Sequence, residues 1–407
     1  MTLRRRLALL AVVIGPGLLA GLSDDDPAGI TTYSVLGAKH GYRLLWVLLL
    51  STVALVLFHD LGARMGIVTG QGLTGLVREA YGVRRASIAV VTLVVANVGT
   101  TCAEFAGVAA GLELFGVSRY VSVPVSAVAV SMLVLGGTFH RIERVLLLLS
   151  AVFVTYILAG ILAGPDWGAA LRGTFTPTLP RSRDAIAITT ATIGTTLAPW
   201  GLSFIQSYAA DKKLDAGQLR DERIDVITGS VLTGVIGFFV VVACAATLNR
   251  NGQSVNDAAD AARALEPLAG DLAGKLFGVG LVGAALLAAS ILPLSTAYSV
   301  SEFVGREAAL DDRPREAPLF YGTYGVVVAL GALLVLIPGA PLVPILVLTQ
   351  LLNAVLLLPL LVFMYGIARD PSLMGDRVAS RASSIAYILA IGAITTCVLV
   401  LTVVSLT

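Results

Sequence analysis

The sequence predicts an all-α polytopic membrane protein with eleven transmembrane helices, of which the first and the sixth are broken. The 407 residues are 57% hydrophobic and only 13% charged, which leaves little polar sequence for a soluble domain. Apolar windows of about 20 residues, the length that crosses a bilayer, recur along the whole chain. Two of these windows contain a proline near the middle, Pro27 and Pro199. Proline interrupts a helix because it lacks the backbone N–H.

The first window also contains three consecutive acids, Asp24, Asp25 and Asp26, directly before Pro27. A carboxylate at bilayer depth is costly, and irregular backbone is tolerated there only where it lines a protein cavity. The sequence therefore predicts a cation site at this break, with Asp26 as the main ligand. One helix face cannot present three consecutive residues, so Asp24 and Asp25 are expected partly to line the approach or to attract cations.

The helices follow from the apolar windows in chain order. They are predicted near residues 8–38 (broken), 43–64, 86–114, 120–138, 142–163, 184–209 (broken), 223–248, 271–305, 318–338, 341–367 and 382–406. With the N-terminus in the cytoplasm and the C-terminus outside, the cytoplasmic segments hold 19 of the 28 Lys and Arg residues. A miscounted helix would invert every later loop and remove this excess. We expect a multi-pass protein of a bacterial-type inner membrane.

The N-terminal residues allow a competing interpretation. Arg4, Arg5 and Arg6 precede an apolar run, as in a cleaved signal peptide. Many spans follow, however, and cleavage would remove the acidic break together with the leader. A retained first helix is the preferred interpretation.

The two breaks suggest an internal repeat. The second break lies in residues 193–201, in the sixth predicted helix. If helices 1–5 and 6–10 are repeats, five crossings is an odd number and the second repeat must be inverted. Interrupted helices at corresponding positions of inverted halves indicate the binding site of a transporter. We expect one transmembrane domain over 1–407, with repeats at about 8–163 and 184–367 and an extra helix at about 382–406.

Several motifs resemble the Nramp family of divalent-metal transporters. Residues 15–19 (GPGLL) and 26–29 (DPAG) resemble the family's GPG…DPGN first helix. Residues 44–49 and 66–70 resemble its second helix and the following turn, and residues 373–375 resemble the segment before its eleventh helix. The resemblance implies a LeuT-type fold and a divalent metal ion as the transported substrate.

The chain departs from the family pattern at positions that matter for the metal. Gly29 replaces the Asn of DPGN, Ala198 replaces the Met of the sixth helix, and Trp200 replaces its His. In the third helix the family's Asp-x-x-Glu pair is here Thr101 and Glu104. This combination resembles the Nramp-related magnesium transporters, a branch described as carrying Mg²⁺ and Mn²⁺ without proton coupling.

These substitutions favour a hard, partly hydrated ion. Loss of the thioether and of the amide removes two direct ligands, one of them soft, and Mg²⁺ usually keeps several waters while binding one or two carboxylates. Thr195 could offer its carbonyl and hydroxyl, and Ser23 its carbonyl. Gln350 resembles a family position that closes over the ion. The residues predicted to form the metal site are Asp26, Glu104, Thr195, Ser23, Gly29, Ala198 and Gln350.

Proton coupling is predicted to be absent. All three histidines, His40, His59 and His140, lie at or near predicted span ends, so none is expected to relay protons at the midplane. Thr101 and Trp200 also stand where the family carries its acid and its histidine. The closest alternative is a proton-coupled Mn²⁺/Fe²⁺ symporter.

Other classes of protein fit less well. A carrier of amino acids would need donors for a carboxylate, which Asp26 repels; a carrier of organic cations also remains an alternative. An enzyme lacks a nucleophile–base pair, a metal-binding histidine cluster and a phosphate loop, and a non-transporting receptor would require that Asp26 no longer binds metal. We expect no cofactor, no nucleic acid and no obligate protein partner, with the metal ion as substrate and the bilayer as surroundings. Asp60, Arg64 and Asp225, near cytoplasmic helix ends, are either solvated charges or gate pairs.

Overall fold

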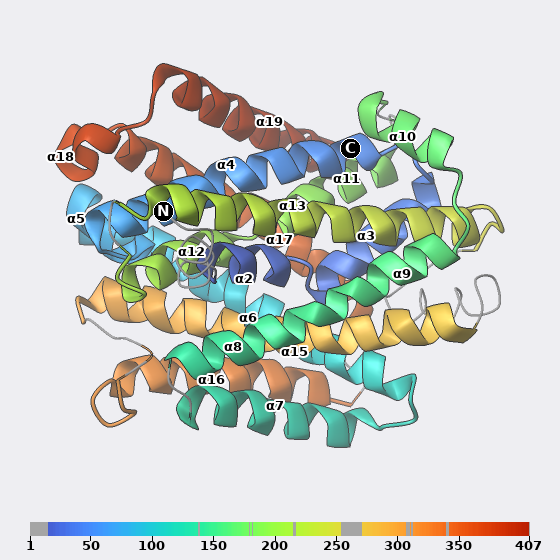
Figure 1. Cartoon of the computed structure of the whole chain (residues 1–407), viewed down its shortest axis with the longest axis horizontal. Coiled ribbons are helices and arrows are strands. Elements are labelled where there is room, and N and C mark those ends of the chain that lie inside the picture. Colours follow the sequence, from blue (N-terminus) through green and yellow to red (C-terminus); the bar gives the residue numbers. More distant parts are fainter. Residues whose placement is uncertain are drawn as a thin grey trace, which may run out of the picture.

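The protein is a bundle of helices that run mostly along one long axis (Figure 1). The computed structural model describes residues 15–136, 139–178, 180, 182–214, 217–253, 271–306, 310, 312–338 and 342–406, and these contain no β-strand. The helices, in chain order, are α2 (Pro16–Ser23), α3 (Pro27–His40), α4 (Leu45–Thr69), α5 (Leu73–Tyr81), α6 (Val83–Glu113), α7 (Arg119–Gly136), α8 (Phe139–Ser150), α9 (Val154–Leu162), α10 (Trp167–Phe175), α11 (Arg183–Thr196), α12 (Pro199–Asp211), α13 (Leu219–Cys244), α15 (Asp271–Val304), α16 (Pro318–Leu336), α17 (Leu342–Ala368), α18 (Pro371–Met374) and α19 (Arg381–Leu406).

The helices match the predicted spans in order. Within the described ranges, nine segments are long and apolar enough to cross a membrane. The pairs α2–α3 and α11–α12 occupy the two windows predicted to be broken, so the arrangement fits eleven crossings. The short helices α5, α10 and α18 were not among the predicted spans. The N-terminal arginines lie outside the described residues.

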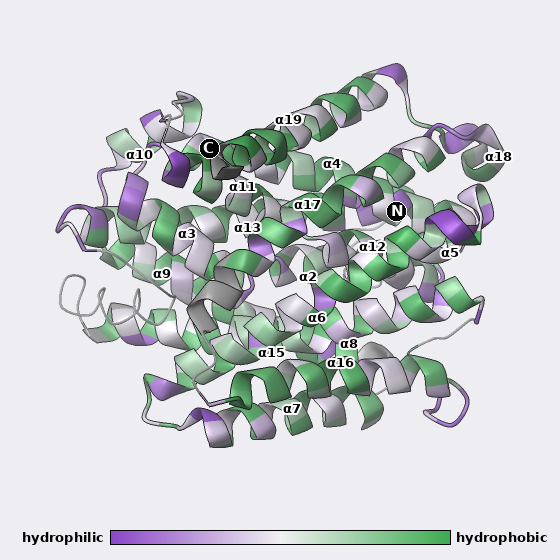
Figure 2. Cartoon of the chain, turned by 180° about the vertical axis from the view of Figure 1, so that it is seen from behind, coloured by the Kyte–Doolittle hydropathy of each residue, from purple (hydrophilic) through white to green (hydrophobic). Residues whose placement is uncertain are grey.

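The outer faces of the bundle suit a bilayer. Figure 2 shows hydrophobic residues along the middle of the bundle and hydrophilic residues gathered near its two ends. Large apolar side chains such as Met132, Leu333 and Leu389 are exposed. A water-soluble protein rarely exposes apolar surface so continuously, whereas lipid tails cover it without cost. The predicted multi-pass membrane protein is confirmed in this respect.

The core is closed by very tight contacts between α2 and α13. A Cβ atom added to Gly17 would collide with the backbone of Val226, and one added to Gly21 would collide with the backbone of Gly229. Small residues let helices approach this closely in membranes. Asp225 strengthens the same contact, because its Oδ2 accepts the backbone N–H groups of Gly15, Gly17 and Leu18 at 3.1, 2.7 and 3.3 Å. Asp225 is thus a buried cap on the N-terminus of α2.

Candidate metal site

The first break forms where α2 ends and α3 begins. α2 ends at Ser23, and the chain turns through Asp24 and Asp25 before Asp26 takes the extended conformation of an N-cap residue. Asp26 Oδ1 accepts the backbone N–H of Gly29 at 2.5 Å. A carboxylate is favoured there because it neutralises the positive end of the helix. The predicted break is confirmed, and it holds the Asp26 carboxylate in a fixed orientation.

The second break has the same form. α11 ends at Thr196, and Leu197 leaves helical geometry with φ −114° and ψ 64°. Ala198 is extended and buried, and Pro199 begins α12 at a position where its missing N–H costs nothing. The predicted second break is also confirmed.

The two breaks meet at Gly29. A Cβ atom added to Gly29 would lie 2.9 Å from Thr195 Oγ1. The same point is 3.1 Å from Asp26 Oδ1 and 3.1 Å from the backbone oxygen of Asp24. Thr195 Oγ1 has no hydrogen-bond partner among the described residues. Three hard oxygen atoms therefore converge on a position that any side chain at residue 29 would occupy; we call them the oxygen cluster.

α6 adds a second carboxylate. Glu104 is fully buried, and its carboxyl group is close enough to that of Asp26 for the two to interact. No N–H or O–H group of the described chain donates to either Glu104 oxygen. Two adjacent buried carboxylates are unfavourable unless a proton or a cation lies between them. The pair is therefore suited to hold a cation beside the oxygen cluster.

Three further residues of the predicted site lie on elements around the breaks. Ser23 is buried at the end of α2, and its hydroxyl has no partner in the described part of the chain. Gln350 lies in α17, which contacts α11 so closely that a Cβ atom on Gly194 would collide with the Gln350 carbonyl oxygen. The side-chain oxygen of Gln350 accepts a hydrogen bond from Asn353 Nδ2 at 3.2 Å. Roles for Ser23, Ala198 and Gln350 at the ion remain predictions.

The prediction for His59, a place near a span end, was wrong. It is fully buried, and its Nε2 lies 3.7 Å from Asp24 Oδ2, too far for a hydrogen bond. α4 continues to Thr69, past the predicted end of that span, so His59 lies inside the helix and faces the first break. His40 is the last residue of α3, as expected. His140 is the second residue of α8, and its side chain lies outside the described part.

The three acids diverge, as expected. Asp26 faces Glu104, and Asp24 faces His59, whose nitrogen lies next to Gly201 of α12. Asp25 is buried and interacts electrostatically with Tyr33 and Tyr156. Among the described residues, no group of three or more His, Cys, Asp or Glu side chains is arranged to hold a metal ion. A bound ion would therefore also use backbone or hydroxyl oxygens and water.

The comparisons place the chain in a family. A family model described as "Natural resistance-associated macrophage protein-like" (Nramp) matches residues 17–404. The chain belongs to the Nramp family. It is 28% identical over 303 residues to "Divalent metal cation transporter MntH" of Bacillus subtilis (strain 168), with 72% of this chain and 71% of the relative covered. It is 27% identical over 399 residues to the protein of the same name from Yersinia pestis (strain Pestoides F), with 94% and 93% covered.

Solved structures confirm the fold of this Nramp chain. The manganese transporter of Eremococcus coleocola, in complex with an aromatic bis-isothiourea substituted compound, superposes with a TM-score of 0.81 at 18% identity, covering 98% of this chain and 87% of that one. MhsT in complex with L-phenylalanine gives a TM-score of 0.62 at 15% identity, with 96% and 97% covered. The predicted LeuT-type fold is confirmed. The relatives are named as transporters, which agrees with the expectation that the chain is not an enzyme.

Proposed function

We propose that this Nramp-family protein imports divalent cations, chiefly Mg²⁺ and also Mn²⁺, by alternating access and without proton coupling. The observation that carries the proposal is the oxygen cluster beside Gly29, together with the neighbouring Glu104 carboxyl. All of these candidate ligands are hard oxygens. None of the five methionines of the chain lies in residues 193–201, so no thioether from the second break selects transition metals.

The site also suits a partly hydrated ion. Asp26 and Glu104 supply two carboxylates, which is the number that Mg²⁺ typically uses while it keeps several waters. Gly29 and Ala198 add little side-chain volume beside those ligands. An inside-negative potential of 100 mV contributes about 4.6 kcal/mol to the entry of a divalent cation, so uptake needs no coupled proton.

A proton-coupled mechanism is the second candidate, and His59 favours it. Its imidazole is buried beside the Asp24 carboxylate at the first break, so the chain does have a histidine near the proposed ion. Trp200 and Thr101 still stand where the family carries its own histidine and acid, which favours the uncoupled mechanism. The two candidates differ in whether metal uptake acidifies the interior.

The test is metal influx into proteoliposomes that contain a Mg²⁺-sensitive dye or a pH-sensitive dye. We expect Mg²⁺ influx without acidification, and loss of influx in Asp26→Ala and Glu104→Gln. Glu113→Gln is the matched control, because Glu113 is on the same helix as Glu104 but exposed. Acidification that accompanies uptake and disappears in His59→Gln would establish the second candidate instead. Unchanged influx in Asp26→Ala would contradict both.

We also propose the topology that the charge bias predicts: an inner-membrane protein with a cytoplasmic N-terminus, an external C-terminus and two inverted repeats followed by α19. The excess of Lys and Arg in alternate loops supports it. A reporter fused after residue 407 that is active only outside the cytoplasm would agree with it, and one active only in the cytoplasm would contradict it.

A further inference from the structure

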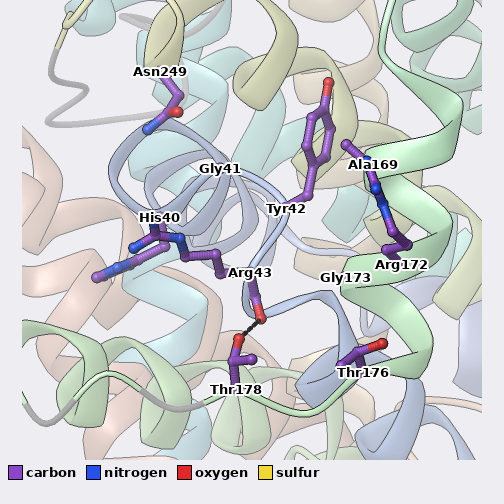
Figure 3. A pocket seen from close by; sticks show the side chains of 10 residues that line it. All are labelled: His40, Gly41, Tyr42, Arg43, Ala169, Arg172, Gly173, Thr176, Thr178 and Asn249. Carbon is purple, nitrogen blue, oxygen red and sulfur yellow. Dashed lines mark hydrogen bonds between the residues drawn. The ribbon is translucent and has the colours of Figure 1, made fainter.

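A pocket lies at the end of α3 that is farther from the metal site. Its cavity volume is about 450 Å³ (Figure 3). α3 rises about 20 Å from Pro27 to His40, which separates this pocket from the breaks. The pocket is formed by the turn between α3 and α4, by α10 and by the π-helical segment Ala245–Asn249, which follows α13. The residues that line it include His40, Tyr42, Arg43, Arg172, Gly173 and Thr178.

The pocket is basic. Arg43 and Arg172 both line it, and in Figure 3 they flank Tyr42 from opposite sides. The His40 ring lies on the Arg43 side, close enough to interact with that guanidinium. The described lining residues include no acid. Two acids lie just outside the lining: Asp184 interacts with His40 and lies 4.0 Å from Lys39, and Asp166 interacts with Tyr42. Two guanidinium groups around one opening favour an anion with several acceptor oxygens.

The walls of the pocket are held together by specific contacts. A Cβ atom added to Gly173 would collide with the Tyr42 carbonyl oxygen, so α10 rests directly on the α3–α4 turn. Thr178 Oγ1 donates to the Arg43 carbonyl oxygen at 3.2 Å, and Trp46 Nε1 donates to the Thr178 carbonyl oxygen at 3.0 Å. The arginines are thus carried by a fixed frame rather than by two independent loops.

α10 indicates the depth of the pocket in the membrane. Trp167, Leu171 and Phe175 follow one another at intervals of four residues and share one helix face. They are 44%, 55% and 70% exposed, respectively. A short helix with such an apolar face lies in the membrane interface, where tryptophan is favoured. The pocket beside it is therefore at the level of the lipid headgroups.

We propose that this pocket binds the phosphate-bearing headgroup of an anionic phospholipid, with Arg43 and Arg172 as the recognising residues. Arginine matches the geometry of a phosphate and can bind two of its oxygens at once. The lipid tails would lie along the exposed face of α10. The pocket shares no residue with the oxygen cluster.

The test is native mass spectrometry of the full chain in detergent. It is titrated with phosphatidylglycerol, with phosphatidylcholine of the same chain length, or with inorganic phosphate. We expect the chain to retain phosphatidylglycerol in preference to phosphatidylcholine. The double variant R43Q/R172Q should bind phosphatidylglycerol about tenfold more weakly, as expected for the loss of charge-assisted contacts.

The matched control is R313Q/R315Q, which removes the same charge from exposed residues in the segment between α15 and α16. It should bind phosphatidylglycerol like the unchanged chain. The single variant R172Q, on the exposed α10, gives a second measurement if the double variant fails to fold. Equal affinity in R43Q/R172Q, or an equal loss in R313Q/R315Q, would overturn the proposal. Binding of inorganic phosphate without retention of lipid would overturn the lipid assignment.

Discussion

Asp225 connects α2 to α13, and its replacement should release α2. Its Oδ2 accepts three backbone N–H groups at the N-terminus of α2, at 2.7 to 3.3 Å, and the residue is only 3% exposed. Hydrogen bonds to a charged group contribute about 1.5–3 kcal/mol each, but the two longer contacts here share one oxygen with the shortest. Loss of a helix N-cap alone costs about 0.5–2 kcal/mol. We therefore expect Asp225→Ala to destabilise the closed contact between α2 and α13 by about 2–3 kcal/mol, which is roughly a 30- to 150-fold shift in equilibrium.

Amide hydrogen exchange measures this shift directly. The informative amides are those of Leu19 to Ser23, because they donate within α2 and not to Asp225. We expect their exchange in Asp225→Ala to be faster by roughly 30- to 150-fold. Asp221→Ala is the matched control, one turn earlier on α13, and should leave these amides unchanged. Unchanged exchange in Asp225→Ala, or equal acceleration in the control, would refute the capping role.

Three further predictions concern the metal site. Ala198→Met should return a thioether to the second break, and sulfur favours the softer metal. Uptake of Mg²⁺ relative to Mn²⁺, measured by competition between the two ions, should therefore fall by roughly tenfold. An unchanged ratio would mean that residue 198 does not face the ion. Gly29→Ala should place its Cβ atom in the oxygen cluster, 2.9 Å from Thr195 Oγ1. Crowding of this kind costs about 1–3 kcal/mol, so uptake by the variant at low Mg²⁺ should fall at least fivefold. Uptake by Gly29→Ala equal to that of the unchanged chain would show that the cluster does not bind the ion. Thr195→Val keeps the shape but removes the hydroxyl, and should weaken Mg²⁺ binding by about 1 kcal/mol in a titration; Thr189→Val, on the same helix, is the control and should bind like wild type.

The two breaks and the fold could be predicted from the sequence because their signals are local. Proline, glycine and acids inside apolar windows have few physical explanations other than a broken helix around a polar site. The cap of Asp26 on Gly29 follows from the same local sequence. Because Asp26 and Gly29 are close along the chain, the hydrogen bond between them depends little on long-range packing.

Two features were missed: the full extent of α4 and a contact between distant segments of the chain. Hydropathy windows locate a helix end only to within a few residues, and an error of about five residues at Thr69 hid the place of His59 inside α4. Ile67 and Val68, apolar residues beyond the predicted end, were the available signal. The cap of Asp225 on α2 could not be predicted, because the two partners are 207 to 210 residues apart. The expectation of a solvated charge was wrong for Asp225, which is buried, and a gate role stays a prediction; Asp60 pairs with Arg223 at 2.8 Å.

The central claim is that a divalent cation binds beside Gly29, between the two breaks. The most direct measurement is the anomalous diffraction of Mn²⁺ in crystals of the unchanged chain and of Asp26→Ala. We expect one anomalous peak within coordination distance of Asp26 and next to Thr195 Oγ1, and no peak there in the variant. A peak at His59 and Asp24, or one that persists beside Gly29 in Asp26→Ala, would contradict the proposed site.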